Sequence, residues 1–436
     1  MAAGQRGTDV VVVGGGLAGL AASVYLARAG RDVVLVEKAA AVGGRARTRS
    51  DDGFQFNLGP HALYRRGVGA AVLQELGVPV AGGRPTGEGG YAVRGGATHT
   101  LPVGFVSLLV TGLLRPPEKM EAARLFGGLR HVNGERFQDV PLSSWLDRIH
   151  SPSVRQLLEA IARVATYAND PERMSAGAAL AQMQGALAGG VLYLHHGWQT
   201  LVDGLRRVAE DAGVHVLEHH PAVALERGAA VRGVRLDDGR TLACGAVLVA
   251  GGPDTVAALV GAAGGSSIVS EWAKRARPVR AASLDVALRA LPRPHATFAL
   301  GIDEPLYASV HSASARLAPD GGALVHVLRY GGLAGDAPEA VERQLAGLLD
   351  SLQPGWRAGV VRQRFLPDLV VAHALPEAAF GGTRGRPGPR VPDVPGLYVA
   401  GDWVGPEGLL ADASLASARA AARAIVAGET RATSAA

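Results

Sequence analysis

The sequence contains very little lysine and a single cysteine. Only three of its 44 lysine and arginine residues are lysines (Lys38, Lys119 and Lys274), and its arginines form no dense run and are not interleaved with aromatic residues. This pattern argues against binding of nucleic acid. A lone cysteine, Cys244, excludes an internal disulfide and a multi-cysteine metal site. We interpret it as a buried, inert thiol, and we expect no bound metal.

Long hydrophobic runs are also missing. No apolar run reaches the length needed to cross a bilayer and no signal peptide precedes the first predicted strand, so we expect a cytoplasmic protein. One twelve-residue apolar run, Val103–Leu114, is followed by basic residues. Such a segment forms either a buried helix or a peripheral membrane contact with its basic flank at the lipid headgroups. Both interpretations of residues 103–130 stay open at this point.

The remaining composition is that of a soluble globular protein. The chain has 436 residues, of which 48% are hydrophobic and 19% charged, and it is long enough for two domains with separate cores. Its 60 glycines suggest closely packed α/β layers. No repeat of solenoid length is present.

A strand, a glycine turn and an acidic residue occur in order near the N-terminus. Asp9 and the apolar run 10–13 lead into Gly14-x-Gly16-x-x-Gly19, and a second apolar run, 33–36, ends at Glu37. The first glycine permits a tight turn, the second lets a pyrophosphate approach the backbone, and the third lets the helix pack close to the sheet. The helix N-terminus favours phosphate, and Glu37 is placed to accept hydrogen bonds from a ribose. The pattern predicts dinucleotide binding.

Further strands and helices follow along the chain. We expect a hairpin over 231–242 with its turn at Asp237-Asp238-Gly239, and a long alanine-rich helix over about 412–427 with Asp412 as its N-cap. Strands are predicted at 214–217, 246–250, 282–288, 323–328 and 396–400. The fold class is therefore α/β, with a parallel-sheet, Rossmann-like nucleotide-binding domain and an inserted α+β domain. The first domain is predicted over 1–85, 197–280 and 385–436, and the second over 86–196 and 281–384.

Three motifs together resemble a known group of flavoproteins. The Gly14–Gly19 turn with Glu37, the following Gly43-Gly44-Arg45, and Gly401-Asp402 before the last helix are similar to the FAD-dependent amine oxidase and phytoene desaturase superfamily. Gly59-Pro60-His61, Gly197–Leu201 and the lack of a second nucleotide motif are most similar to its desaturase and protoporphyrinogen-oxidase side. The resemblance implies a non-covalently held FAD and a largely apolar substrate tunnel.

The resemblance also implies which residues bind the cofactor. The phosphates would lie at the glycine turn and at the segment after Glu37, the adenosine at Glu37 and the Val223 backbone, the ribitol chain at Gly401-Asp402, and the flavin at the Gly59 turn and the start of the last helix. The implied residues are Gly14, Gly16, Ala18, Gly19, Glu37, Lys38, Gly44, Arg45, Gly59, Pro60, His61, Val223, Gly401, Asp402, Leu409, Leu410 and Ala411. His61 is either a proton relay near the flavin or a loop histidine satisfied by backbone.

Two departures bear on the reaction. Many amine oxidases have a lysine beside flavin N5. In this chain it would fall in the strand after Pro278, where no lysine occurs, which argues against amine oxidation. No cysteine lies in the C-terminal flavin segment, which excludes a thioether link to FAD. The identities of the catalytic residues stay unknown.

The function predicted is that of an FAD-dependent oxidoreductase. It would desaturate a largely apolar small molecule by hydride transfer to flavin N5, with O2 or a quinone as the electron acceptor. The alternatives are an amine or amino-acid oxidase, a redox-neutral FAD-dependent isomerase, and, from a different class, a prenyl-protein-binding module on the same fold.

Overall fold

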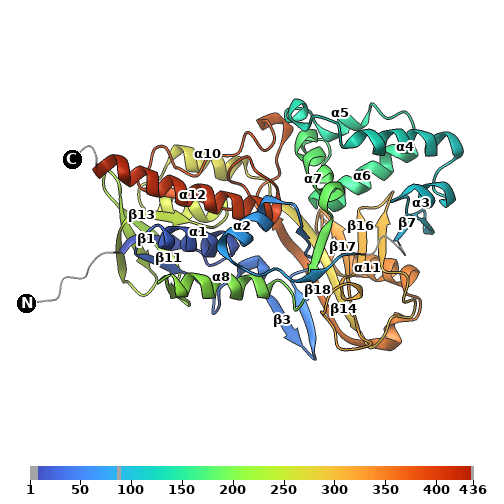
Figure 1. Ribbon diagram of the computed structural model, residues 1–436, viewed down its shortest axis with the longest axis horizontal. Helices are drawn as coiled ribbons and strands as arrows, with labels where there is room; N and C mark the ends of the chain where they lie inside the picture. Colours follow the sequence, from blue (N-terminus) through green and yellow to red (C-terminus); the bar gives the residue numbers. More distant parts are fainter. Residues whose placement is uncertain (1–7, 86–89, 434–436) are drawn as a thin grey trace, which may run out of the picture.

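Two seven-stranded sheets, side by side in Figure 1, form the framework of the molecule. The computed structural model describes residues 8–85 and 90–433, with side chains described as far as residue 428. Parallel and antiparallel pairs occur in the first sheet, and the second is mostly antiparallel. The protein thus has a mixed α/β fold.

The first sheet brings together strands from the two ends and the middle of the chain. Its order is β10-β2-β1-β13-β12-β11, with β19 paired to β13. The pairs β10·β2, β2·β1, β1·β13 and β13·β19 are parallel, and the β13–β12–β11 edge is antiparallel. The strands are β1 (Thr8–Val13), β2 (Val33–Val36), β10 (His215–Leu217), β11 (Ala222–Arg227), β12 (Val231–Leu236), β13 (Thr241–Val249) and β19 (Leu397–Val399).

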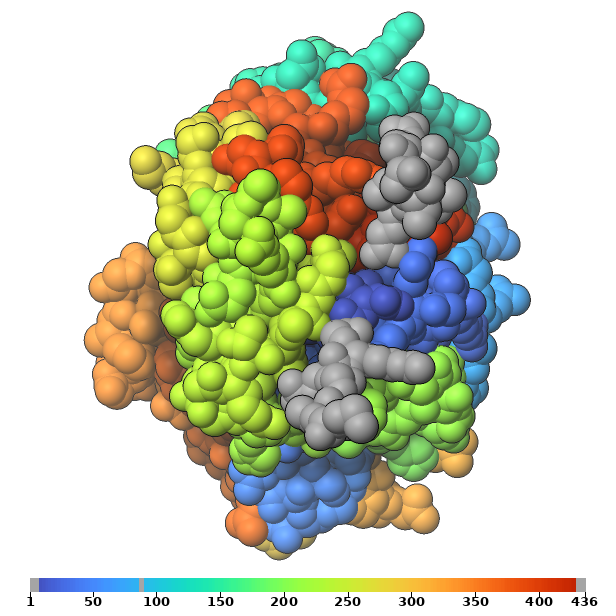
Figure 2. Space-filling model, turned by 90° about the vertical axis from the view of Figure 1, so that its left-hand side faces the viewer, coloured from blue at the N-terminus to red at the C-terminus, as the bar shows by residue number. Residues whose placement is uncertain are grey.

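Alternating side chains of these strands build two separate cores. Val10 and Val12 of β1 pack with helices on one face, and Val11 and Val13 pack with β11, β12 and α9 on the other, because successive strand residues point to opposite faces. The helices are α1 (Leu17–Arg28), α2 (Val68–Leu76), α8 (Gln199–Asp211), α9 (Pro253–Gly261), α10 (Ser267–Arg275) and α12 (Leu410–Thr433). Figure 2 shows this end of the molecule, where N-terminal, central and C-terminal segments lie against one another.

The second sheet has the order β18-β14-β17-β16-β15-β7-β8. All of its pairs are antiparallel except β15·β7. Its strands are β7 (Gly90–Arg94), β8 (Ala97–Thr100), β14 (Val279–Leu288), β15 (Phe298–Gly301), β16 (Leu306–Val310), β17 (Ala323–Tyr330) and β18 (Val360–Ala372).

The two faces of the second sheet have different covers. The helix α11 (Pro338–Leu352) packs on one face against Leu284 and Val325. The opposite face meets a helical layer at one end and the hairpin of β3 (Thr48–Asp51) and β4 (Phe54–Asn57) at the other. The helical layer consists of α3 (Phe105–Val110), α4 (Pro116–Leu129), α5 (Leu142–Leu146), α6 (Pro152–Thr166) and α7 (Ala176–Gly189). A small sheet, β5 (Leu63–Tyr64), β9 (Val191–Leu194) and β6 (Gly82–Gly83), completes this layer.

Most predicted elements are present in the structure. The hairpin over 231–242 is confirmed as β12 and β13, and the last helix extends from 410 to 433. Strand β14 begins at Val279, just before the predicted boundary between residues 280 and 281. The division of the chain into two domains stays a prediction.

The apolar run after Val103 is not a buried helix. It contains the six-residue helix α3, of which Leu108 is buried, while Phe105 is 77% exposed and Val106 70% exposed. A helix this short presents only one side to the core, so most of its apolar side chains face outward. Across the described parts of the chain, every helix is too short or too polar to cross a membrane.

Candidate FAD site

The turn after β1 has no room for a side chain at two of its three motif glycines. Gly14 has φ +104° and donates its N–H to the Val36 carbonyl at 2.8 Å. A Cβ added to Gly14 would lie 2.9 Å from the Ala250 oxygen, and one on Gly19 would lie 1.9 Å from the Gly14 oxygen. These glycines therefore let α1 begin directly against the sheet.

The middle glycine of the motif, Gly16, has open space where a side chain would stand. It is the N-cap of α1, no side chain caps it, and a Cβ placed on it would meet nothing within 4 Å. The first N–H groups of a helix have no partner within it, so this end presents donors and a positive dipole to an anion. Ala18 is buried in the same first turn, and Gly44 lies against Gly16, where its added Cβ would be 3.6 Å from the Gly16 Cα. The cradle fits a pyrophosphate.

Glu37 lies beside this turn at the end of β2. Its Oε2 accepts the Gly15 N–H at 2.7 Å and its Oε1 accepts the Ala39 N–H at 2.8 Å. A carboxylate has about four acceptor positions, so lone pairs remain for ribose hydroxyls. The Glu37 carbonyl also accepts the His220 N–H at 3.0 Å, which brings the segment before β11 to this edge. Val223 is 43% exposed at the start of β11, and Lys38 is exposed.

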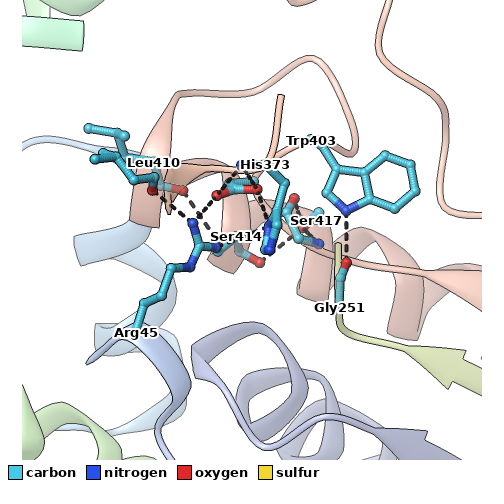
Figure 3. Close-up of polar contacts among 10 residues, drawn as sticks. Arg45, Gly251, His373, Trp403, Leu410, Ser414 and Ser417 are labelled. Carbon is cyan, nitrogen blue, oxygen red and sulfur yellow. Dashed lines mark hydrogen bonds and ion pairs between the residues drawn. The ribbon is translucent and has the colours of Figure 1, made fainter. Parts of the chain in front are cut away.

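Arg45 and Asp402 form an ion pair, although 357 positions separate them in the chain; Asp402 is buried, and the Arg45 side chain is 38% exposed. Arg45 Nη1 lies 2.7 Å from Asp402 Oδ2, and His373 Nδ1 lies 2.9 Å from Asp402 Oδ1. Arg45 also donates to the Val371 carbonyl at 2.7 Å. Figure 3 shows Arg45 and His373 converging from different segments, next to Trp403, whose indole N–H donates to the Gly251 carbonyl at 2.9 Å. His373 was not predicted from the sequence.

The charge of Asp402 is fixed by these neighbours. Burial by itself raises the pKa of this carboxyl, but the Arg45 charge and the hydrogen bonds from His373 lower it far below its usual range. Gly401 before it is held by Ser417, which accepts the Gly401 N–H and donates to the Gly401 carbonyl, both at 2.9 Å. A permanently ionised carboxylate at this position suits the acceptance of hydroxyl hydrogen bonds.

The Gly59-Pro60-His61 turn packs against the second sheet. Gly59 has φ +77° and a Cβ on it would lie 3.5 Å from the Ser283 side chain of β14. His61 Nδ1 lies 3.1 Å from the Gly59 carbonyl oxygen, and its ring meets Trp198 edge-on at 5.1 Å. Burial lowers the pKa of His61 to about 4, so the ring is neutral near pH 7. A backbone bond satisfies one ring nitrogen, and the relay role stays a prediction.

The start of α12 lies beside a small pocket of about 10 Å³, room for about one water molecule. Leu409 is buried, Leu410 has φ +56°, and Ala411 is partly buried. Arg386 also reaches the pocket and donates to the Gly408 carbonyl at 2.9 Å. The pocket is lined by Thr166, Ala168, Met174, Val279, Ala372, Ala374, Leu375, Pro376, Arg386, Leu409 and Leu410.

Asp412 is not the N-cap of the last helix, contrary to the prediction. The helix already begins at Leu410, so Asp412 lies in its first turn and its Oδ1 accepts the Gly69 N–H of α2 at 2.9 Å. Burial raises the pKa of Asp412 to about 6. The sequence pattern could not reveal this contact, because Gly69 and Asp412 are far apart in the chain.

The structure brings several of the predicted residues together. Glu37 and Gly44 lie at the glycine turn, and Arg45 pairs with Asp402. No group of three or more His, Cys, Asp or Glu side chains arranged to hold a metal occurs within the described residues. The donor set fits a dinucleotide carrying a flavin: free helix N–H groups for phosphate, acceptors for hydroxyls and a small, mostly apolar pocket at the start of α12.

Comparisons with known proteins identify the family of this chain. The family of flavin containing amine oxidoreductases matches residues 17–426. Protoporphyrinogen oxidase from Bos taurus is 38% identical over 171 residues, covering 36% of this chain and 34% of that protein. Hydroxyneurosporene desaturase from Cereibacter sphaeroides is 30% identical over 285 residues, covering 56% of each. The chain thus spans about a third to about half of the length of these relatives.

Solved structures share the fold at low identity. Cyclohexylamine oxidase from Brevibacterium oxydans has a TM-score of 0.74 at 17% identity, covering 98% of this chain and 100% of that one. An oxidoreductase from Methanosarcina mazei has a TM-score of 0.74 at 20% identity, covering 96% and 100%. Since the family match extends over nearly the whole chain, this protein belongs to the flavin-containing amine oxidoreductases.

Proposed function

We propose that this protein is an FAD-dependent enzyme that oxidises a largely apolar small molecule by hydride transfer to flavin N5, as in desaturation of a C–C bond. The observation that carries the proposal is the mostly apolar set of side chains around the small pocket at the start of α12, where the resemblance places the flavin. Ala372 and Ala374 in its wall flank His373, the residue bound to Asp402, and most of the remaining lining is aliphatic. An apolar pocket with few polar groups selects an apolar ligand.

In this proposal the chain holds FAD in a Rossmann-like arrangement. The α1 N-terminus would hold the pyrophosphate, Glu37 the adenosine ribose, Asp402 the ribitol chain, and the dipole of α12 would stabilise negative charge at the pyrimidine side. FAD, when bound, supplies a two-electron acceptor. Flavin reoxidation by O2 or a quinone is the corresponding second half-reaction.

Anaerobic mixing tests the substrate class. The purified, FAD-loaded protein is mixed separately with protoporphyrinogen IX, with a carotene in detergent micelles, and with benzylamine, while the flavin absorbance is followed. We expect bleaching by an apolar probe and none by benzylamine, because β14 carries no lysine. Bleaching by benzylamine alone would favour an amine oxidase, and bleaching by NADH or NADPH would favour a reductase or a reduced-flavin isomerase. Air or a soluble quinone added after photoreduction identifies the acceptor.

We also infer that α3 and the start of α4 contact a membrane surface carrying anionic lipid. Phe105 is 77% exposed, Val106 70% and Val110 65%, and Val103, Leu109 and Met120 are each more than half exposed. Single exposed apolar residues are ordinary, but a contiguous group favours an apolar partner. Basic residues next to it suit lipid phosphates: Arg115, Lys119, Arg124 and Arg130.

Vesicle sedimentation tests the membrane contact. The double variant Phe105→Ser/Val106→Ser is compared with Leu187→Ser, which removes an equally exposed apolar side chain (63%) from α7. We expect the parent and the Leu187 variant to sediment with vesicles containing phosphatidylglycerol and the α3 variant to stay in solution. Equal sedimentation of all three proteins, or none by the parent, contradicts the inference.

A further inference from the structure

A row of polar residues crosses the second sheet. At one level of the sheet, Arg364 of β18 pairs with Asp285 of β14, Asp285 with His326 of β17, and His326 with Ser309 of β16. The neighbours of His326 along its strand, Val325 and Val327, pack toward α11. Because strand residues alternate between faces, His326 points to the opposite face, where β4 and the Gly59 turn lie.

Asp285 has a full set of partners in this row. Its Oδ1 lies 2.7 Å from His326 Nδ1 and accepts the Ser283 hydroxyl at 2.8 Å, while its Oδ2 accepts an Arg364 N–H at 2.6 Å. Arg364 also donates to the Asn57 carbonyl. Asp285 and His326 are both fully buried. Burial raises the pKa of Asp285, but the charges and hydrogen bonds of His326 and Arg364 lower it below its usual value.

The ionised carboxylate determines where the proton of His326 resides. A carboxylate can only accept, so His326 must donate from Nδ1, and in the neutral ring Nε2 is then an acceptor. That Nε2 is buried and has no hydrogen-bond partner, and the same holds for Nδ1 of His311. A buried polar atom without a hydrogen-bond partner costs free energy, so its presence needs a functional or structural explanation.

One further histidine, His311, is in ring contact with His326, and a second, His61, belongs to the Gly59 turn on the same face of the sheet. The His311 ring is 4.6 Å from the His326 ring and stacks on Tyr193 at 3.7 Å, and its Nε2 lies 3.3 Å from the Tyr307 hydroxyl. Burial is the main cause that lowers the pKa of both His61 and His311, and His326, when it is protonated, lowers them further. Both rings are therefore neutral near pH 7. Only His326 has a carboxylate beside it that can stabilise a positive charge.

We propose that His61, His311 and His326 form a buried proton relay in which His326, held by Asp285, takes up the proton that the substrate loses on oxidation. This rests on the proposed function. One substrate C–H bond gives a hydride to oxidised flavin, the electron pair of the adjacent C–H bond forms the C=C bond, and the proton released passes to the relay. Asp285 is a positioning residue: it fixes the tautomer of His326 and stabilises the imidazolium.

His61 connects the relay to the candidate cofactor site. Its turn packs on Ser283, the neighbour of Asp285 on the same face of β14, and the charge of Arg45 contributes to its lowered pKa. The groups that face the relay are Asp285 and Ser283 from β14, Arg364 from β18, Ser309 and Tyr307 from β16, and Tyr193 from β9. Among these groups, Asp285 supplies the negative charge.

The first test needs no substrate. The FAD-loaded protein is labelled with 15N-histidine, and the ring signals are followed by NMR from about pH 5 to about pH 9. We expect one ring with a protected Nδ1–H that gains a second proton on acidification, and we expect this signal to be absent in His326→Gln. If the signal assigned to His326 stays uncharged over the whole range, the relay is wrong, whatever the substrate screen shows.

The second test uses the probe that reduces the parent flavin. In His326→Gln we expect the anaerobic reduction rate to fall by about 10²-fold or more, with unchanged FAD content and loss of the ionisation seen in the parent pH profile. The double variant Asp285→Asn/Arg364→Gln, which leaves no buried charge unpaired, should shift that ionisation to lower pH. His295→Gln, at an exposed histidine, is the control. Parental rate and pH profile in His326→Gln overturn the proposal, whereas a parent that no probe reduces contradicts the proposed function instead.

Discussion

The glycine turn and the polar row of the second sheet differ in how the chain brings their residues together. At the turn, Gly14 and Gly19 are five positions apart and their contact follows from one strand–turn–helix unit. In the polar row, Asp285 reaches a partner 41 positions away in His326 and another 79 positions away in Arg364. The first region is encoded by spacing, and the second only by the pairing of strands. Substitutions at residues with local and with long-range contacts test this difference.

The largest effect is expected at Gly19. In Gly19→Ala the new Cβ would lie 1.9 Å from the Gly14 oxygen, a backbone atom that can move only with the turn. We expect destabilisation of about 3 kcal/mol or more and little folded protein. Unfolding by urea measures it where the protein can be purified, and recovery in the soluble fraction where it cannot.

Gly16→Ala is the matched variant for that experiment. A Cβ on Gly16 meets nothing within 4 Å, so folding without cofactor should change by less than about 1 kcal/mol. The added methyl would stand where we place the pyrophosphate, so FAD affinity should fall by about tenfold or more. If Gly16→Ala binds FAD with the affinity of the parent, the phosphate site does not lie at this turn. If Gly16→Ala is as unstable as Gly19→Ala, the two glycines do not differ in the way we expect.

Asp412 is an exception to this comparison, because it lies in the first region but makes a contact with a residue far away in the chain. Burial raises the pKa of this carboxyl to about 6, so the folded protein favours the neutral acid. The contribution of that acid is fully present below about pH 4 and is lost as pH rises through about 6. We therefore expect Asp412→Asn, which stays neutral, to be more stable than the parent by roughly 2–3 kcal/mol at pH 8.

Urea unfolding at two pH values tests this expectation. The difference between Asp412→Asn and the parent should vanish at about pH 3, where Asp412 is neutral in both the folded and the unfolded chain. A stability difference of the same size at both pH values would attribute the effect to packing against Gly69 and not to ionisation.

Substitution of Glu37 tests whether the first region binds the cofactor. In Glu37→Ala a ribose hydroxyl loses a charged acceptor, which costs roughly 1.5–3 kcal/mol, so FAD affinity should fall about ten- to a hundredfold. Titration of the stripped protein with FAD measures it. The variant also removes acceptors from the Gly15 and Ala39 N–H groups, so its unfolding without FAD must be recorded alongside. Equal affinity in variant and parent would show that Glu37 does not bind the ribose.

Release of the cofactor is a related expectation. We expect FAD to leave the chain on acid denaturation, since Cys244, the only cysteine, is buried in β13. Flavin that stays with the precipitated protein would contradict non-covalent binding.

The sequence was informative where a residue's role depends on its neighbours in the chain. The turn glycines, Glu37 and the hairpin over 231–242 have local causes: backbone sterics, helix packing and turn chemistry. His373, Asp285 and His326 could not be predicted, because each gains its partner only when distant strands pair. One signal was nevertheless present, since Asp285 interrupts the apolar stretch Ala281–Leu288. A lone acid in a buried strand needs partners, but the sequence does not name them.

The smallest expected effect concerns two glycines that have no role of this kind. Gly127 and Gly128 lie near the end of α4, are exposed, and have open space where a Cβ would stand. Alanine restricts the unfolded chain and favours the helix, so Gly127→Ala should stabilise the protein by roughly 0.5–1 kcal/mol and leave FAD affinity unchanged. Urea unfolding and FAD titration measure the two quantities. A loss of FAD affinity would mean that α4 is coupled to the cofactor site. Compared with Gly19→Ala, this variant shows how strongly the contacts around a glycine determine whether alanine can replace it.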